Sequence, residues 1–257
     1  MPATGEKYFF VSSLAKGLSV LELLAEHDEL SVSEVAHHLG FNRAGSHRFL
    51  ATLRELGYVE QTAQNRYRLT FKLFRMGSAV VGRFEILRMA QPLMSELSRA
   101  FGETVNLGYL DGTEVLHIDK IDSPEVLRMD SPVGTRAPLY CTGLGKAMLG
   151  FLPEDERDRI LEAIELKPQS PRTITSRETL LKELQKIRAN GYAIDNEELC
   201  KGVRCVAAPV FDHTGVSRYA ISVAGPVTRV TSARVKDIQK DVRRVCEALS
   251  RALGNTA

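Results

Sequence analysis

The sequence predicts a protein of the α+β class that is built from two different parts. Its 257 residues exceed one average domain and fall short of three. Through most of the first 100 residues apolar side chains recur with the period of a helix, whereas from Thr104 the period changes to two, as in strands. We therefore expect an N-terminal domain over residues 8–70, a helical linker over 71–100 and a mixed domain over 101–257.

The composition is that of an ordinary globular protein, with 44% hydrophobic and 26% charged residues and a net charge of +2. This near-neutral balance excludes a binder of nucleic acid that is basic throughout, but a local basic face would suffice for DNA. No apolar run approaches the roughly 20 residues of a membrane helix, and the N-terminus lacks the apolar segment of a secretion signal. The four cysteines have no CxxC spacing, so we expect a cytoplasmic protein without cofactor or metal. A zinc site that uses Cys200 and Cys205 stays open.

The first two predicted helices are marked by their apolar spacing and their ends. Val11 to Ala25 carry apolar residues at helical intervals. Ser31 and Glu34 have the spacing of a capping box, in which each side chain bonds the backbone of the other residue. Gly40 suits the left-handed conformation at a helix end. Two helices joined by a tight turn are therefore expected.

A third helix and a hairpin complete the first 70 residues. Asn42 is the expected N-cap of this helix, and Gly57 ends it. The polar tip 62–65 separates two short strands at 58–60 and 67–69. Three helices followed by a hairpin form the layout of a winged helix-turn-helix, in which the third helix enters the major groove of DNA. A three-helix bundle without any role in DNA binding is the alternative.

The linker and the C-terminal domain are predicted from the same two spacings of apolar residues, that of a helix and that of a strand. Helical spacing continues over 71–100, where Pro92 must either kink a helix or lie in the first turn of a second one. Asp111-Gly112 is a hairpin turn signal. The strands expected in this domain are 104–110, 114–121, 126–129, 192–195, 205–211 and 217–223, and the helices are 143–151, 153–164, 177–189 and 232–253.

The distribution of charge favours DNA binding over the bundle. Residues 1–70 carry 7 lysines and arginines and 8 acids, yet the third helix, over 42–54, has three arginines and no acid. The stretch 61–84 is also free of acids and holds five basic residues. Phosphate contacts require such segregated basic segments. The expected DNA-binding residues are Asn42, Arg43, Ser46, His47 and Arg48 in the helix, and Arg66 and Tyr67 in the wing.

Several segments together resemble a known family. Residues 30–69 are similar to the DNA-binding domain of the IclR family of bacterial transcription regulators, and the resemblance covers about 11–253. The motifs of the second half that resemble the family's effector domain are 139–146, 191–198, 202–209 and 220–226. Within the family, the regulators that sense 2-keto-3-deoxygluconate, a sugar acid, are the most similar in the stretches 70–74, 172–176 and 195–198. Aromatic-acid sensors share much of the same background.

The resemblance implies a GAF-like domain that binds a small organic acid. It places the acid's carboxylate at the backbone N–H groups of Gly143 and Leu144, at a helix start, where the dipole favours an anion. It also implies ligand contacts from Asp195, Cys205 and Ser222, with Asp195 toward a hydroxyl or keto end. Each of these has an ordinary structural alternative, such as a turn brace for Asp195 or a small buried side chain for Cys205.

Two departures from the family pattern stand out. Ser46 replaces a valine that is usually buried, in a helix start Ala44-Gly45-Ser46 that often reads Ser-Thr-Val in the family. Ala224 stands where the family often has a second serine, so one hydrogen-bond donor is lost. The first position bears on operator preference and the second on which effector fits.

The function expected from the sequence is that of a one-component transcription regulator. A homodimer, or a dimer of dimers, would bind double-stranded palindromic operator DNA and respond to a small organic acid, with a sugar acid favoured over an aromatic acid. Whether it represses or activates is open. An enzyme is the alternative of another class, with Cys205, His213 and Asp195 as a thiol triad. We expect no enzyme, because His213 lies in a turn signal before Gly215 and points to the surface.

Overall fold

The computed structural model describes residues 10–81 and 85–255 of the chain. The contacts divide it into one unit from Met1 to Arg83 and another from Phe84 to Ala257. The boundary falls inside the stretch expected as a linker. Of the domain ranges expected above, residues 8–9, 82–84 and 256–257 lie outside the described residues.

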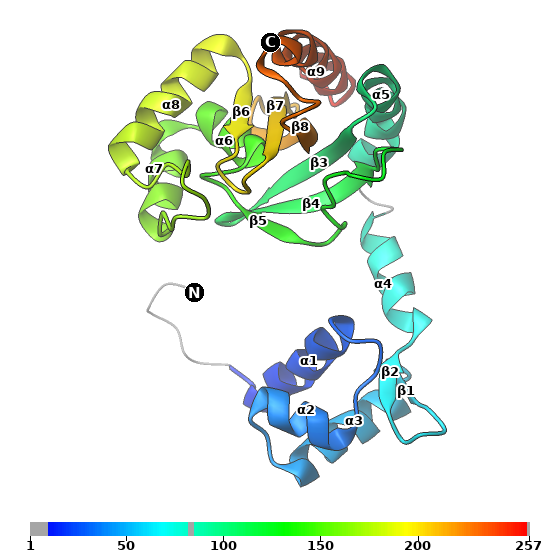
Figure 1. Cartoon of the computed structure of the whole chain (residues 1–257). Helices are drawn as coiled ribbons and strands as arrows, with labels where there is room; N and C mark the ends of the chain where they lie inside the picture. The colour runs from blue at the N-terminus through cyan, green and yellow to red at the C-terminus, as the bar shows by residue number, and fades with distance from the viewer. Residues whose placement is uncertain (1–9, 82–84, 256–257) are drawn as a thin grey trace. The chain divides into compact units, whose positions relative to one another are not determined.

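The first unit begins with three helices and a two-stranded hairpin (Figure 1). Ser31 accepts a hydrogen bond from the Glu34 backbone, while the Glu34 carboxylate accepts one from Ser31 N–H, which forms the predicted capping box. Gly40 then ends the second helix with a left-handed φ of 64°. The elements are α1 (Ser12–Ala25), α2 (Val32–Leu39), α3 (Arg43–Glu55), β1 (Val59–Gln61) and β2 (Tyr67–Leu69).

The stretch expected as a linker contains two helices that belong to different units. Helix α4 (Phe71–Val81) begins beside the hairpin of the first unit, where the Thr70 hydroxyl donates to Gly57 O. Helix α5 (Glu85–Phe101) packs into the core of the second unit through an apolar face. Pro92 lies exposed in the interior of α5, so no second helix starts there.

A six-stranded antiparallel sheet in the order β5-β4-β3-β8-β7-β6 is the centre of the second unit. Its third strand along the chain is Arg136–Pro138. Residues 126–129, which were expected to form this strand, lie instead in the loop before it, and the prediction is wrong there because Val126 and Leu127 are exposed. The strands are β3 (Thr104–Asp111), β4 (Glu114–Ile121), β5 (Arg136–Pro138), β6 (Ala193–Asn196), β7 (Val203–Phe211) and β8 (Ser217–Pro226).

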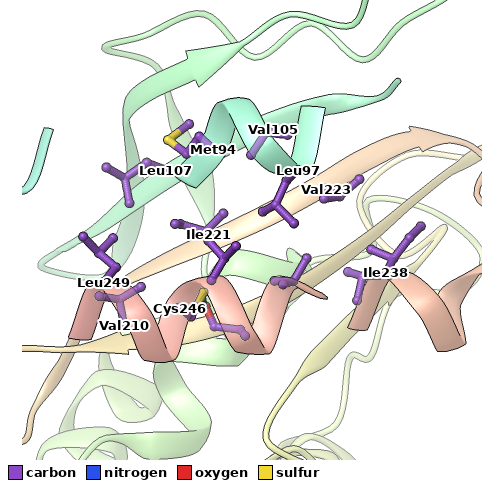
Figure 2. Packing of buried hydrophobic residues seen from close by; sticks show 14 of the residues in the cluster. Met94, Leu97, Val105, Leu107, Val210, Ile221, Val223, Ile238, Cys246 and Leu249 are labelled. Atoms are coloured by element: carbon purple, nitrogen blue, oxygen red, sulfur yellow. Dashed lines mark hydrogen bonds between the residues drawn. The ribbon is translucent and has the colours of Figure 1, made fainter. Parts of the chain in front are cut away.

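Helices cover both faces of the sheet, and this explains the alternation along its strands. Helices α5 and α9 (Ser232–Ala252) pack on one face against residues such as Val105, Leu107 and Ile221 (Figure 2). Helix α6 (Gly143–Phe151) packs on the other face and is backed by α8 (Arg177–Asn190), with α7 (Glu154–Ala163) beside them. Side chains alternate between the two faces along each strand. The residues that alternate with Val105, Leu107 and Ile221 therefore point toward α6. Within the described residues, no helix is long and apolar enough to cross a membrane.

Candidate functional site

Helix α3 presents a basic, solvent-facing surface. Arg43, His47 and Arg48 are all exposed on it, and neither arginine forms an ion pair with any described residue. The Asn42 side chain caps the helix by accepting from Gly45 N–H at 2.6 Å. A Cβ on Gly45 would stand 3.0 Å from that Asn42 oxygen, so glycine leaves room for the cap. The helix therefore begins at Arg43 and holds its cations free for phosphates or bases.

Two residues expected at the DNA surface are buried instead. Ser46 has no exposed surface, and its hydroxyl has no hydrogen-bond partner among the described residues. Tyr67 is 2% exposed and belongs to the core of the first unit, where its backbone pairs with Leu30. The expectation that these two side chains contact DNA is wrong for this conformation, because the inward side of α3 and the alternation of β2 point them into the core.

The wing arginines are held by carboxylates of the same unit. Arg66 contacts the Glu29 carboxylate at 2.9 Å and that of Glu34 at 3.0 Å. The Ser31 backbone N–H and hydroxyl, followed by Arg66, lower the pKa of Glu34 to about 2. Arg68 pairs with Glu60 at 2.7 Å. Carboxylates thus pair both arginines of the hairpin, whereas Arg43 and Arg48 on α3 have no such partner among the described residues.

The effector residues expected in the second unit come together around one cavity. Gly143, Leu144, Asp195, Cys205 and Ser222 all line it, although they are spread over 80 positions of the chain. The cavity encloses about 440 Å³ of empty space, including its open mouth. Its other lining residues are Asn106, His117, Met129, Ser131, Thr142, Leu199, Cys200, Val203 and Ala224.

The N-terminus of α6 forms one end of the cavity. Thr142 caps the helix by accepting from Gly145 N–H at 3.1 Å, and its hydroxyl donates to Pro138 O at 2.8 Å. Gly143 is packed so closely that a Cβ there would stand 2.9 Å from the Cys205 sulfur. The first N–H groups of a helix have no carbonyl one turn earlier, and the helix dipole is positive at this end. An anionic group fits here by charge and by hydrogen bonding.

Asp195 lies at the far strand of the cavity and is 4% exposed. One of its oxygens accepts from Glu198 N–H at 2.7 Å and from Leu199 N–H at 3.4 Å. Burial raises the pKa of Asp195 to about 6, although these hydrogen bonds oppose the change. The residue therefore braces a turn and also faces the cavity, and both readings from the sequence fit this position.

A buried ion pair supports the same wall. The Lys146 ammonium on α6 is fully buried, bonds the Glu198 carboxylate and donates to Ile194 O at 2.7 Å. Burial raises the pKa of Glu198, while Lys146 lowers it. Removal of one partner would leave an uncompensated charge inside the protein. The pair therefore fixes the turn after β6 against α6.

Three polar atoms in the cavity lack partners. They are Asn106 Oδ1, His117 Nδ1 and Ser222 Oγ; within the described part of the chain none has a hydrogen bond of good geometry, and Ser222 has only the Cys205 thiol beside it. Asn106 and His117 were not predicted as site residues from the sequence. Polar residues that alternate with apolar ones along a strand usually face solvent, and these two fit that pattern. The signal available was the Asp111-Gly112 turn, since its hairpin places His117 opposite Gly108, two residues from Asn106.

The thiol triad considered from the sequence is not assembled. Burial raises the pKa of Cys205 to about 12, which opposes formation of a thiolate. His213 is exposed beyond the other end of β7, and eight residues of extended chain span about 25 Å. Cys200 and Cys205 line the cavity, but no group of three or more possible metal ligands exists among the described residues.

Comparison with known proteins identifies both units. The family model for the IclR helix-turn-helix domain matches residues 13–63, and that for the bacterial transcriptional regulator IclR C-terminal matches residues 78–251. The HTH-type transcriptional regulator KdgR of Escherichia coli is 39% identical over 245 residues, which are 95% of this chain and 93% of the relative. The regulator XynR of the same organism is 36% identical, with 96% and 99% covered.

Solved structures agree with this assignment. The crystal structure of the Thermotoga maritima IclR matches with a TM-score of 0.82 and 35% identity, covering 95% of this chain and 99% of that one. A transcriptional regulator from Rhodococcus matches with a TM-score of 0.84 and 30% identity, covering 95% and 98%. The N-terminal unit is a winged helix-turn-helix that binds DNA, and the second unit is the family's effector domain. The chain belongs to the IclR family of bacterial transcription regulators.

Proposed function

We propose that a small organic acid binds in the cavity of the second unit and controls the affinity of the first unit for operator DNA. The observation that carries this proposal is the cavity, which has an anion-compatible helix end and buried polar groups without good hydrogen bonds among the described residues. The acid's carboxylate lies at Gly143 and Leu144, with Ser222 as a further hydrogen-bond partner. We favour a sugar acid of the 2-keto-3-deoxygluconate type, because the relatives named KdgR support the subgroup seen in the sequence.

Helix α3 recognises DNA, and the α3 helices of two subunits form a symmetric pair. Arg43, His47 and Arg48 reach bases or phosphates, while Asn42 keeps the helix start in place. Arg66 acts through its ion pairs with Glu29 and Glu34, which hold the wing. A homodimer presents two such helices to a palindromic operator.

The dimer contact is supported by apolar side chains that the first unit leaves uncovered. Phe71 is 87% exposed and Phe74 71% exposed on α4. Helix α1 also exposes Leu14 and Leu18, and its N-cap Val11 is exposed as well. A large apolar patch that is exposed on a single chain usually marks an interface with another protein. We propose that these two helices pair subunits, and that a second contact between dimers gives a tetramer.

The regulator works by differential binding. The acid binds one conformation of the second unit more tightly than another and shifts the population toward it. Repression and activation both follow from these parts, depending on which conformation binds DNA. Because operator DNA lies in the bacterial cytoplasm, we propose that the protein acts there, and we propose no catalytic reaction for it.

A gel-shift measurement tests the assignment of α3. The Arg43→Ala/Arg48→Ala double variant should weaken binding to DNA selected by the wild type from a random pool by about 100-fold or more. Arg251→Ala, an exposed arginine at the end of α9, removes the same kind of charge from the second unit and should leave the affinity unchanged. Equal retention by the double variant and the wild type would refute the role of these arginines.

A thermal-shift screen against small organic acids tests the effector site. Acids that bind the cavity should raise the unfolding temperature in a concentration-dependent way. Ser222→Ala should reduce that rise. Failure of every sugar acid and every aromatic acid to stabilise the wild type would refute the proposal.

A further inference from the structure

Asn106, His117 and Ser222 lie on one face of three neighbouring strands. Asn106 of β3 is the direct partner of Ser222 in β8. Gly108, two residues further along β3, is the partner of His117 in β4. Paired residues share a face of a sheet, and so do residues two apart in one strand. The three side chains therefore form one polar wall on the α6 side, where they line the cavity.

Each side chain of this polar wall is almost completely buried. Asn106 is 2% exposed, His117 7% and Ser222 1%, and each has one atom without a hydrogen-bond partner among the described residues. Such an atom destabilises a folded protein, because it loses its hydrogen bonds to water on burial and gains none in return. Three of them around one cavity are best explained by a ligand that completes their hydrogen bonds.

The chemistry of the three atoms selects the kind of ligand group. The Asn106 oxygen only accepts, the Ser222 hydroxyl donates and accepts, and a neutral imidazole nitrogen does one or the other. Burial lowers the pKa of His117, so its ring stays neutral at physiological pH. A neutral wall suits hydroxyl groups, which both donate and accept. An aromatic ring in the same place would leave all three atoms unpaired.

We infer that Asn106, His117 and Ser222 bind hydroxyl groups of the effector and make the cavity selective for a hydroxylated aliphatic acid over an aromatic one. The inference rests on the proposed function, since it takes the acid's carboxylate to lie at the start of α6. Asn106 and His117 are its new specificity-determining residues. The wall and the helix end flank the same cavity, so one short ligand meets both.

Calorimetry on the full-length protein with three probe acids tests the inference. The probes are 2-keto-3-deoxygluconate, 2-oxohexanoate, which has the same carbon number and keto acid group but no hydroxyls, and benzoate. The wild type should bind the hydroxylated acid at least about 100-fold more tightly than the other two, because a site built for hydroxyls rejects analogues without them. Comparable binding of 2-oxohexanoate or benzoate would overturn the inference and leave the proposed function standing. Binding of none of the three would overturn both.

Isosteric variants separate recognition from folding. His117→Phe and Asn106→Leu should each weaken binding of 2-keto-3-deoxygluconate at least about tenfold and leave 2-oxohexanoate unchanged. The ligand-free variants should unfold at the same temperature as the wild type or higher, because an unpaired polar atom has been removed. His213→Phe, on an exposed histidine outside the cavity, is the matched control. If a variant bound both acids more weakly by the same factor, or kept the selectivity of the wild type, the polar wall would not recognise hydroxyl groups.

Discussion

Replacement of Asp195 by asparagine should stabilise the protein at alkaline pH and do little at acidic pH. Burial raises the pKa of this carboxyl from 3.8 to about 6 in the folded chain. A raised pKa means that the folded state holds the proton more tightly than the unfolded state does. The stabilising contribution of the protonated form is therefore present at low pH and is lost as the pH rises through about 6.

The magnitude follows from the two pKa values. At about 1.4 kcal/mol for each pH unit between them, the ionised carboxylate costs the folded state about 3 kcal/mol at pH 8. At pH 4 most of that cost is absent. Asparagine is neutral at both pH values, and its side-chain oxygen can still accept the N–H groups of Glu198 and Leu199. For a domain of this size, 3 kcal/mol corresponds to about 6–12 °C in unfolding temperature.

Thermal unfolding followed by circular dichroism at pH 4 and pH 8 checks this prediction in the ligand-free protein. Asp195→Asn should raise the unfolding temperature of the second unit at pH 8 by several degrees more than at pH 4. Asp237→Asn, on an exposed carboxylate of α9, is the control and should change neither value. An effect of equal size at both pH values would refute the account of Asp195 as a strained buried acid.

Three further substitutions test the packing around the two sites, each by thermal or urea unfolding. Ser46→Ala should stabilise the first unit by about 1 kcal/mol, because it removes a buried hydroxyl without a partner and raises helix propensity; destabilisation would show that the hydroxyl is bonded. Lys146→Met should cost about 3–5 kcal/mol, because it leaves Glu198 as an uncompensated buried charge, and an unchanged midpoint would contradict this. Gly145→Ala should cost about 1–3 kcal/mol, since its Cβ would stand 2.2 Å from Leu139 O; wild-type stability would exclude so close an approach.

The sequence predicts the elements of the first unit well because their signals are local. The Ser31–Glu34 capping box, the left-handed Gly40 and the Asn42 cap all depend on residues within one helical turn. The direction of side chains on α3 was harder to predict. Ser46 is the one polar residue on the buried side of this helix. Its hydroxyl favoured a DNA contact, although the family resemblance places a usually buried valine at this position.

The cavity residues, too, could be predicted where the signal lies in a local motif and not where it depends on contacts between distant segments. The motifs around Gly143, Asp195, Cys205 and Ser222 were recognised, and the structure places all four residues at one site. The ion pairs of Arg66 and the depth of His117 depend on contacts between distant segments, which period and composition do not encode. A polar residue on a strand usually faces solvent, but His117 lines a cavity on the sheet face that α6 covers, and its backbone is bonded by the loop before β5.

The most direct test of the central claim is the affinity of the full-length protein for its selected DNA with and without 2-keto-3-deoxygluconate. We expect the acid to change the dissociation constant about tenfold or more in the wild type, consistent with a coupling free energy of about 1.4 kcal/mol. Ser222→Ala should lose most of this response and keep the affinity measured without the acid. An equal dissociation constant with and without saturating acid, in a wild type that binds both DNA and acid, would contradict the claim that the cavity controls DNA binding.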